Sequence, residues 1–179
     1  MVPHPRHAAA VGLASAVLFL FPVSAAPAQE GSKTFAAALT LHPPRLDPVV
    51  TAAVLEAHRR LEESRCRELF RDFEDAAGRT PQENLDAIGL TGQSYLGWLW
   101  FVDGSGQSRC GESEVLAFTV PGSRVIYYCG DRFRRQVSRR GLGVLAVAIL
   151  HEELHSLGVG ENPPSSLEIT RRVEFRCGS

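Results

Sequence analysis

The segment from Gly141 to Leu157 constrains the fold more than any other part of this sequence. It is apolar nearly all the way round a helix, which predicts a helix packed inside the domain. The same segment carries His151, Glu152 and His155, and such polar side chains cost free energy to bury unless something pairs them. The chain must therefore supply both a core around this helix and a partner for its polar groups.

The spacing of these polar residues indicates a metal site. Residues four apart share one helical face, so the imidazoles of His151 and His155 can bind one ion, with Glu152 beside its remaining positions. Zinc is the expected ion, because it accepts histidine and carboxylate ligands and, with three protein ligands, keeps a position for water. We therefore expect a catalytic zinc site in which Glu152 is the general base.

Two glutamates compete for the role of third zinc ligand. Glu161 follows a glycine at which the helix would break, and the prolines after Asn162 stiffen the loop that would return it to the ion. Glu168 has a structural explanation as the partner of Ser165 in a capping box that starts the last helix. We expect Glu161 to be the ligand and keep Glu168 as the alternative.

The string His151-Glu152-x-x-His155-x-x-Gly158-x-x-Glu161 resembles the extended motif of the zincin metallopeptidases, with the spacing of the metzincin branch. In that branch the glycine allows a turn that returns a third ligand, usually a histidine. The methionine turn of true metzincins is missing, since Met1 is the only methionine. The pattern also resembles glutamate-type zincins, which would favour Glu168, and small secreted bacterial proteins of the zincin type.

This resemblance implies a secreted zinc metalloendopeptidase that hydrolyses peptide bonds in a protein or peptide substrate with zinc-activated water. It also implies a sheet edge strand just before the active-site helix, to which a substrate peptide can add, and Arg124 to Cys129 is the candidate. Tyr127 and Tyr128 on that strand are interpreted as packing residues, with stabilisation of an oxyanion as the alternative. The alternative function is a secreted, disulfide-stapled binding or structural module with a non-catalytic zinc site.

Local signals elsewhere predict an α+β domain. We expect a small, mainly antiparallel sheet packed on the active-site helix, with helices at both ends of the chain. The first helical pattern fits either one long helix or two shorter ones. Helix starts are expected at Asp47 with Pro48, at Thr80 with Glu83 and at Ser165 with Glu168. Strands are expected over 96–102, 115–120 and 124–129, and the last two should pair as a hairpin.

The first residues have the pattern of an export signal, with Arg6 and His7 before an apolar run and small residues through Ala28. We expect a signal peptide over 1–28, a linker or surface strap over 29–46 and a single zincin-like catalytic domain over 47–179. The mature chain of about 150 residues would carry a net charge of about −2, which gives no reason to expect a nucleic-acid partner. Without a later membrane span, we expect a secreted or periplasmic protein with no stable membrane insertion.

Four cysteines in an oxidising compartment predict two disulfides. Cys110 and Cys129 are near neighbours around the expected hairpin, which leaves Cys66 with Cys177 to tie the first helical region to the last helix. Three pairings are open from sequence alone. No cysteine lies near the cleavage region, so lipid attachment is not expected.

Several other residues receive a structural interpretation. His58 is expected on the surface, and Glu153 is expected to be solvated because it points roughly opposite His151. Trp98 and Trp100 are expected to pack in the core from one face of a strand, with a ligand-binding platform as the alternative. The arginines of 132–140 are expected to form a solvated face that favours, at most, acidic substrates.

Overall fold

The computed structural model describes residues 41–43 and 45–178. The predicted signal peptide and most of the predicted strap lie outside these residues. Within the described chain, seven α-helices and two short 3-10 helices accompany a three-stranded sheet. This arrangement confirms the predicted α+β class.

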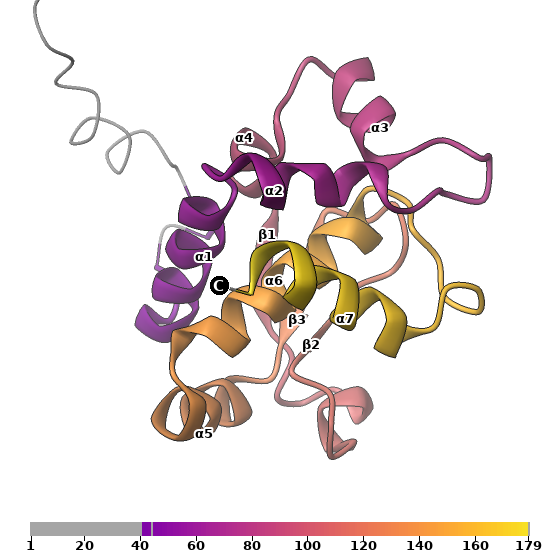
Figure 1. Cartoon of the computed structure of the whole chain (residues 1–179). Helices are drawn as coiled ribbons and strands as arrows, with labels where there is room; N and C mark the ends of the chain where they lie inside the picture. Colours follow the sequence, from indigo (N-terminus) through magenta and orange to yellow (C-terminus); the bar gives the residue numbers. More distant parts are fainter. Residues whose placement is uncertain (1–40, 44, 179) are drawn as a thin grey trace, which may run out of the picture. The chain divides into compact units, whose positions relative to one another are not determined.

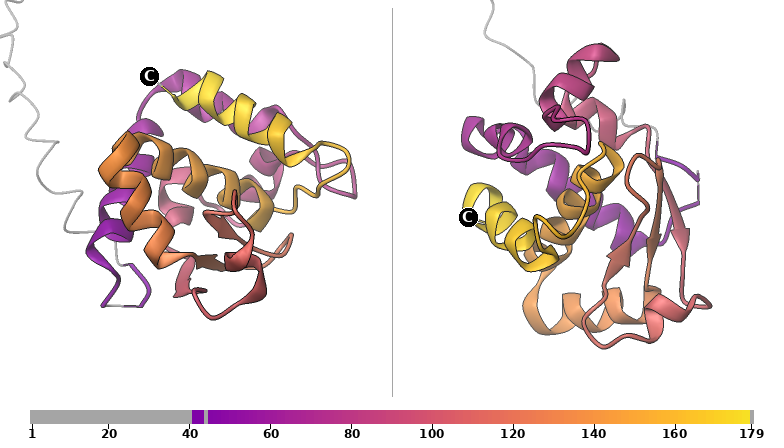
Figure 2. Two further views of the ribbon diagram at one scale, coloured as in Figure 1. Left: turned by 90° about the horizontal axis from the view of Figure 1, so that it is seen from below. Right: turned by 90° about the vertical axis from the view of Figure 1, so that its right-hand side faces the viewer.

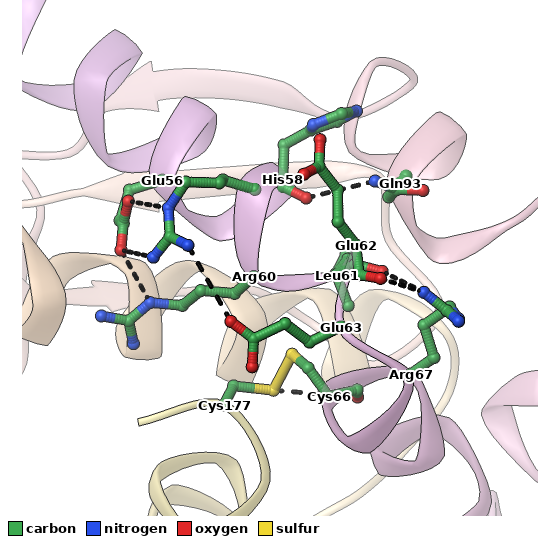
Figure 3. A network of polar contacts seen from close by, with 11 residues as sticks. Glu56, His58, Arg60, Leu61, Glu62, Glu63, Cys66, Arg67, Gln93 and Cys177 are labelled. Atoms are coloured by element: carbon green, nitrogen blue, oxygen red, sulfur yellow. Dashed lines mark hydrogen bonds and ion pairs between the residues drawn. A yellow bond between two sulfur atoms is a disulfide. The ribbon is translucent and has the colours of Figure 1, made fainter. Parts of the chain in front are cut away.

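The first helical pattern folds as three short pieces, α1 (Pro48–Arg60), α2 (Ser64–Arg67) and η1 (Glu68–Arg71). The Asp47 carboxylate accepts a hydrogen bond from the Val49 N–H at 2.8 Å, so the predicted N-cap is confirmed. Figure 3 shows the turn after α1, where the Arg67 guanidinium donates to the carbonyls of Leu61 and Glu62. This turn lies just before Cys66, which the same view shows bonded to Cys177.

Two capping boxes shape the middle of the chain. Thr80 and Glu83 start α3 (Pro81–Ala87) as predicted, and a box that was not predicted starts α4 (Gly92–Leu96). Because α4 includes Leu96, strand β1 spans only Trp100–Asp103. Strand alternation then points Phe101 into the core, whereas Trp98 and Trp100 are 46% and 48% exposed. The prediction that both tryptophans pack in the core is wrong.

The sheet is mixed rather than mainly antiparallel. Strands β2 (Ala117–Phe118) and β3 (Val125–Tyr128) form the predicted antiparallel pair, but β1 pairs with the other side of β3 in parallel. The strand order is β1-β3-β2, so β3 is the central strand. The prediction that β3 would offer an edge to a substrate is therefore wrong, because β1 and β2 are the two edge strands.

Three helices complete the fold: α5 (Gly130–Arg140), α6 (Leu142–Ser156) and α7 (Ser166–Cys177). Gly141 separates α5 from α6 with a φ of 77°, a left-handed conformation that favours glycine. As Figures 1 and 2 show, α6 lies between the sheet and α7, and α1 and α5 pack beside it. The predicted central position of the apolar helix is confirmed, since every residue from Leu145 to Leu157 except Ala148 is buried.

Both predicted disulfides are present. Cys66–Cys177 joins α2 to the end of α7, and Cys110–Cys129 joins η2 (Ser108–Gly111) to the N-cap of α5. In the part of the chain that the structure describes, no helix has the length and apolar character needed to cross a membrane.

Candidate metal centre

The last turns of α6 and the loop after it bring three potential metal ligands together. His151 and His155 lie one helical turn apart, and the helix ends before Gly158, which has a φ of 104°. A Cβ at Gly158 would also meet the Asp75 Cβ at 3.1 Å, so both conformation and space favour glycine here. The loop then returns Glu161 to the histidines.

The ligand atoms of His151, His155 and Glu161 all lie within 4.8 Å of one another. The two Nε2 atoms are 3.0 Å apart, and the Nε2 of His155 is 3.4 Å from a carboxylate oxygen of Glu161. Both imidazoles are buried, whereas Glu161 is partly open to solvent. The sequence prediction of one site formed by these three side chains is consistent with this geometry.

Each imidazole is held by its other ring nitrogen. The Nδ1 of His155 lies 2.7 Å from the carbonyl oxygen of Val159, which can only accept, so this nitrogen donates its proton and leaves Nε2 with a lone pair. The Nδ1 of His151 lies 3.0 Å from the Thr170 hydroxyl on α7. Thr170 was not identified from sequence, because neither its residue type nor its spacing relates it to the two histidines.

The donor set fits a zinc ion. Two imidazole nitrogens and a carboxylate are ordinary zinc ligands, and hydrogen bonds at Nδ1 orient both rings as they do in known zinc sites. Burial, and then the neighbouring His155, lowers the pKa of His151 to about 3. His151 is therefore neutral at neutral pH, and its Nε2 can offer a lone pair to a cation bound beside His155.

Glu152 points toward the same region from α6. Its carboxylate receives a hydrogen bond from the backbone of Thr119, just after β2, and its Oε2 has no partner among the described residues. Burial, followed by the charge of Glu161, raises the pKa of Glu152 to about 8, while Arg109 and the Thr119 hydrogen bond act in the opposite direction. Arg109 was not identified from sequence.

Two predictions about neighbouring polar residues are wrong. Glu153 is not solvated but fully buried, because α6 is covered on this side as well, and neither of its carboxylate oxygens has a partner in the described chain. Burial raises its pKa well above the usual value. His58 is also buried, on the inward face of α1.

A cavity of about 460 Å³ opens over the three ligand candidates and Glu152. Its walls come from α5 and α6, from one face of α7 and from residues 113–119, which include edge strand β2. Neither Tyr127 nor Tyr128 lines it: Tyr128 is buried in the core and Tyr127 stacks on Phe118, so the packing interpretation of both is supported.

The two competing glutamates have different surroundings. Glu161 lines the cavity beside the histidines, whereas Glu168 is exposed and accepts hydrogen bonds from the Ser165 N–H at 3.0 Å and its hydroxyl at 2.9 Å. Glu168 thus forms the predicted capping box and does not belong to the ligand group.

Comparison with protein-family models, with curated proteins and with solved structures finds no match to this chain. The function of this chain is therefore inferred from the geometry of the site.

Proposed function

We propose that this protein is a zinc-dependent metallopeptidase with His151, His155 and Glu161 as metal ligands and Glu152 as general base. One observation carries the proposal: the three ligand atoms converge within 4.8 Å on the wall of a cavity that Glu152 also lines. A structural zinc site needs no such cavity and no unligated acid beside it.

The chemistry divides between the ion and the chain. A zinc ion held here would polarise a substrate carbonyl and lower the pKa of a water molecule. A nearby cation also favours the ionised form of Glu152, which can then accept a proton at Oε2 and donate it to the leaving amine. The Thr119 hydrogen bond would hold this carboxylate in position.

The edge strand supports a peptide as the substrate. Ala117, Phe118 and Thr119 line the cavity, and the side of β2 away from β3 has no neighbouring strand in the described sheet. An extended peptide can pair with such an edge and so pass over the ligand group.

Secretion is part of the same proposal. Two disulfides are compatible with an oxidising compartment, and the first 28 residues have the pattern of an export signal. We propose that the mature protein acts in the periplasm or the medium.

The proposal is tested by loading the purified protein with zinc, measuring bound metal, and following cleavage of an unlabelled protein such as casein and of a fluorogenic peptide library. We expect about one zinc per chain and cleavage that stops with chelator and returns with added zinc. Stoichiometric zinc without any cleavage would instead favour a binding or structural module with a non-catalytic zinc site.

A further inference from the structure

One face of α5 forms a polar wall of the cavity. Arg132, Gln136 and Arg140 are spaced by four residues, so they lie on one side of the helix, and all three line the cavity. The predicted solvated face of arginines is therefore wrong for Arg132, which is partly buried. A ligand in the cavity can therefore contact this face of α5.

Arg132 fixes the opposite wall. Its guanidinium donates to the Cys110 carbonyl at 3.0 Å and also to the carbonyls of Glu112 and Val115. Through these hydrogen bonds the guanidinium holds the loop that leads into β2. Arg132 consequently has a structural role and is not the group that meets a ligand.

Gln136 and Arg140 have no such partners. The Oε1 of Gln136 is buried without a hydrogen bond, and among residues 41–43 and 45–178 no ion pair or hydrogen bond engages the Arg140 side chain. Rotating the Gln136 side-chain amide by 180° would place its NH2 group where Oε1 now lies. This side chain can therefore donate a hydrogen bond to an oxygen or accept one from a donor. Both residues are therefore available to a ligand.

The remaining charges of the cavity do not neutralise Arg140. Arg109 also lines the cavity, and its guanidinium carbon lies 5.5 Å from the centre of the Phe118 ring. Glu114 and Glu174 also line the cavity, but neither makes an ion pair with an arginine in the described part of the chain. With a zinc ion bound, the cavity would carry an excess of positive charge.

An apolar path connects Arg140 to the metal ligands. Val144, Val147 and Ala148 line the cavity along α6 between Arg140 and His151. His151 lies seven positions after Val144 on α6, which corresponds to about 10 Å along the helix. About three residues of extended peptide cover the same length.

We propose that Arg140 and Gln136 form a subsite for a carboxylate of the peptide substrate, two or three residues from the bond that is cleaved. A guanidinium and an amide together match a carboxylate in charge and in hydrogen-bonding geometry. The carboxylate comes either from an aspartate or glutamate side chain or from the C-terminus of the peptide. This inference rests on the proposed function for its substrate class, but its test reads binding alone.

The test measures binding of fluorescent peptides to the zinc-loaded Glu152→Gln protein, which prevents turnover. One peptide carries a glutamate and an amidated C-terminus, a second has no acid but a free C-terminus, and a third has neither. We expect one of the two carboxylate peptides to bind about tenfold more tightly than the third peptide. This difference in affinity should shrink at high salt. The peptide that shows this preference identifies the source of the carboxylate.

Two charge reversals on α5 separate the subsite from general electrostatics. Arg140→Glu should abolish the preference, whereas Arg139→Glu should keep it, because Arg139 has the same charge but does not line the cavity. Equal binding of all three peptides, or equal effects of the two variants, would overturn the subsite. If the parent cleaves peptides but shows no such preference, the subsite is wrong and the proposed function stands. If the preference depends on Arg140 but the parent cleaves no peptide, the subsite stands and the proposed function is wrong.

Discussion

The two sides of α6 each bury a glutamate, and comparing them distinguishes a candidate site from an isolated buried acid. On the cavity side, Glu152 lies with His151 and His155, and their polar atoms meet groups from the loop after β2, from α7 and from the loop after α6. On the core side, Glu153 is buried at least as deeply, yet neither carboxylate oxygen meets a partner in the described residues. Burial alone therefore does not mark a functional residue, whereas convergence of polar groups from several elements does.

The largest expected effect distinguishes these adjacent glutamates by activity. Glu152→Gln should keep zinc and reduce peptide hydrolysis by about 10²–10⁴-fold, because the base is lost and no ligand is removed. Glu153→Gln is the matched control and should cleave within a few-fold of the parent. Cleavage rates on the same peptide and zinc content per chain provide the measurement. Equal losses in the two variants would remove the functional distinction between the two sides of the helix.

The second prediction concerns the ligand that comes from outside the helix. Glu161→Ala should weaken zinc binding by more than about a hundredfold, since it removes a direct ligand rather than a group behind one. Glu168→Ala should cost only ~1 kcal/mol of stability, because it removes a helix cap.

Zinc retention on dialysis against a competing chelator compares Glu161→Ala with Glu168→Ala directly. Retention by the first variant together with loss by the second would move the ligand assignment to Glu168.

A smaller effect is expected where α7 supports the site. Thr170→Val keeps the shape of the side chain but removes the hydroxyl that contacts the Nδ1 of His151 at 3.0 Å. Zinc affinity should fall by about 10–100-fold, as is typical when a group behind a metal ligand is lost. Thr170→Ser, which keeps the hydroxyl, should restore most of the affinity. If the valine variant binds zinc like the parent, the ring of His151 is oriented by packing alone.

The parts of the fold that depend on short-range signals could be predicted from sequence. The Asp47 N-cap, the boxes at Thr80 and Ser165 and the helical spacing of His151 and His155 are local patterns. The parallel pairing of β1 with β3 was not predictable in the same way, because it joins segments separated by the whole β2 region. That pairing makes β3 the central strand, so sequence alone could not show that β2 is the edge strand at the cavity wall.

The error at Glu153 has a different origin. The sequence predicts that α6 is apolar all round, which leaves no solvated side, and a polar residue anywhere on its second half should have been expected inside. Thr170 and Arg109 were missed for a third reason. Each approaches the site from a distant part of the chain, and neither residue type nor spacing relates it to the metal-binding motif.

The last expected effect is on stability alone and concerns the core side of α6, measured as the stability of the zinc-free protein against pH. Burial raises the pKa of Glu153 above its ordinary value of 4.5, so above that pH the unfolded chain ionises while the folded protein keeps the proton. The unfolded state then binds fewer protons, and the parent loses about 1.4 kcal/mol of stability per pH unit through this group. Glu153→Gln removes that loss and keeps the shape.

The difference in free energy of unfolding between Glu153→Gln and the parent should therefore be constant below pH 4.5 and grow as the pH rises from about 5 to 7. Urea denaturation at several pH values measures it, and the shared contributions of Glu152 and the histidines cancel in the difference. A difference that stays flat over this range would mean that Glu153 ionises in the folded protein and has a compensating partner. The contrast between an isolated acid on the core side of α6 and a convergent group on the cavity side would then fail.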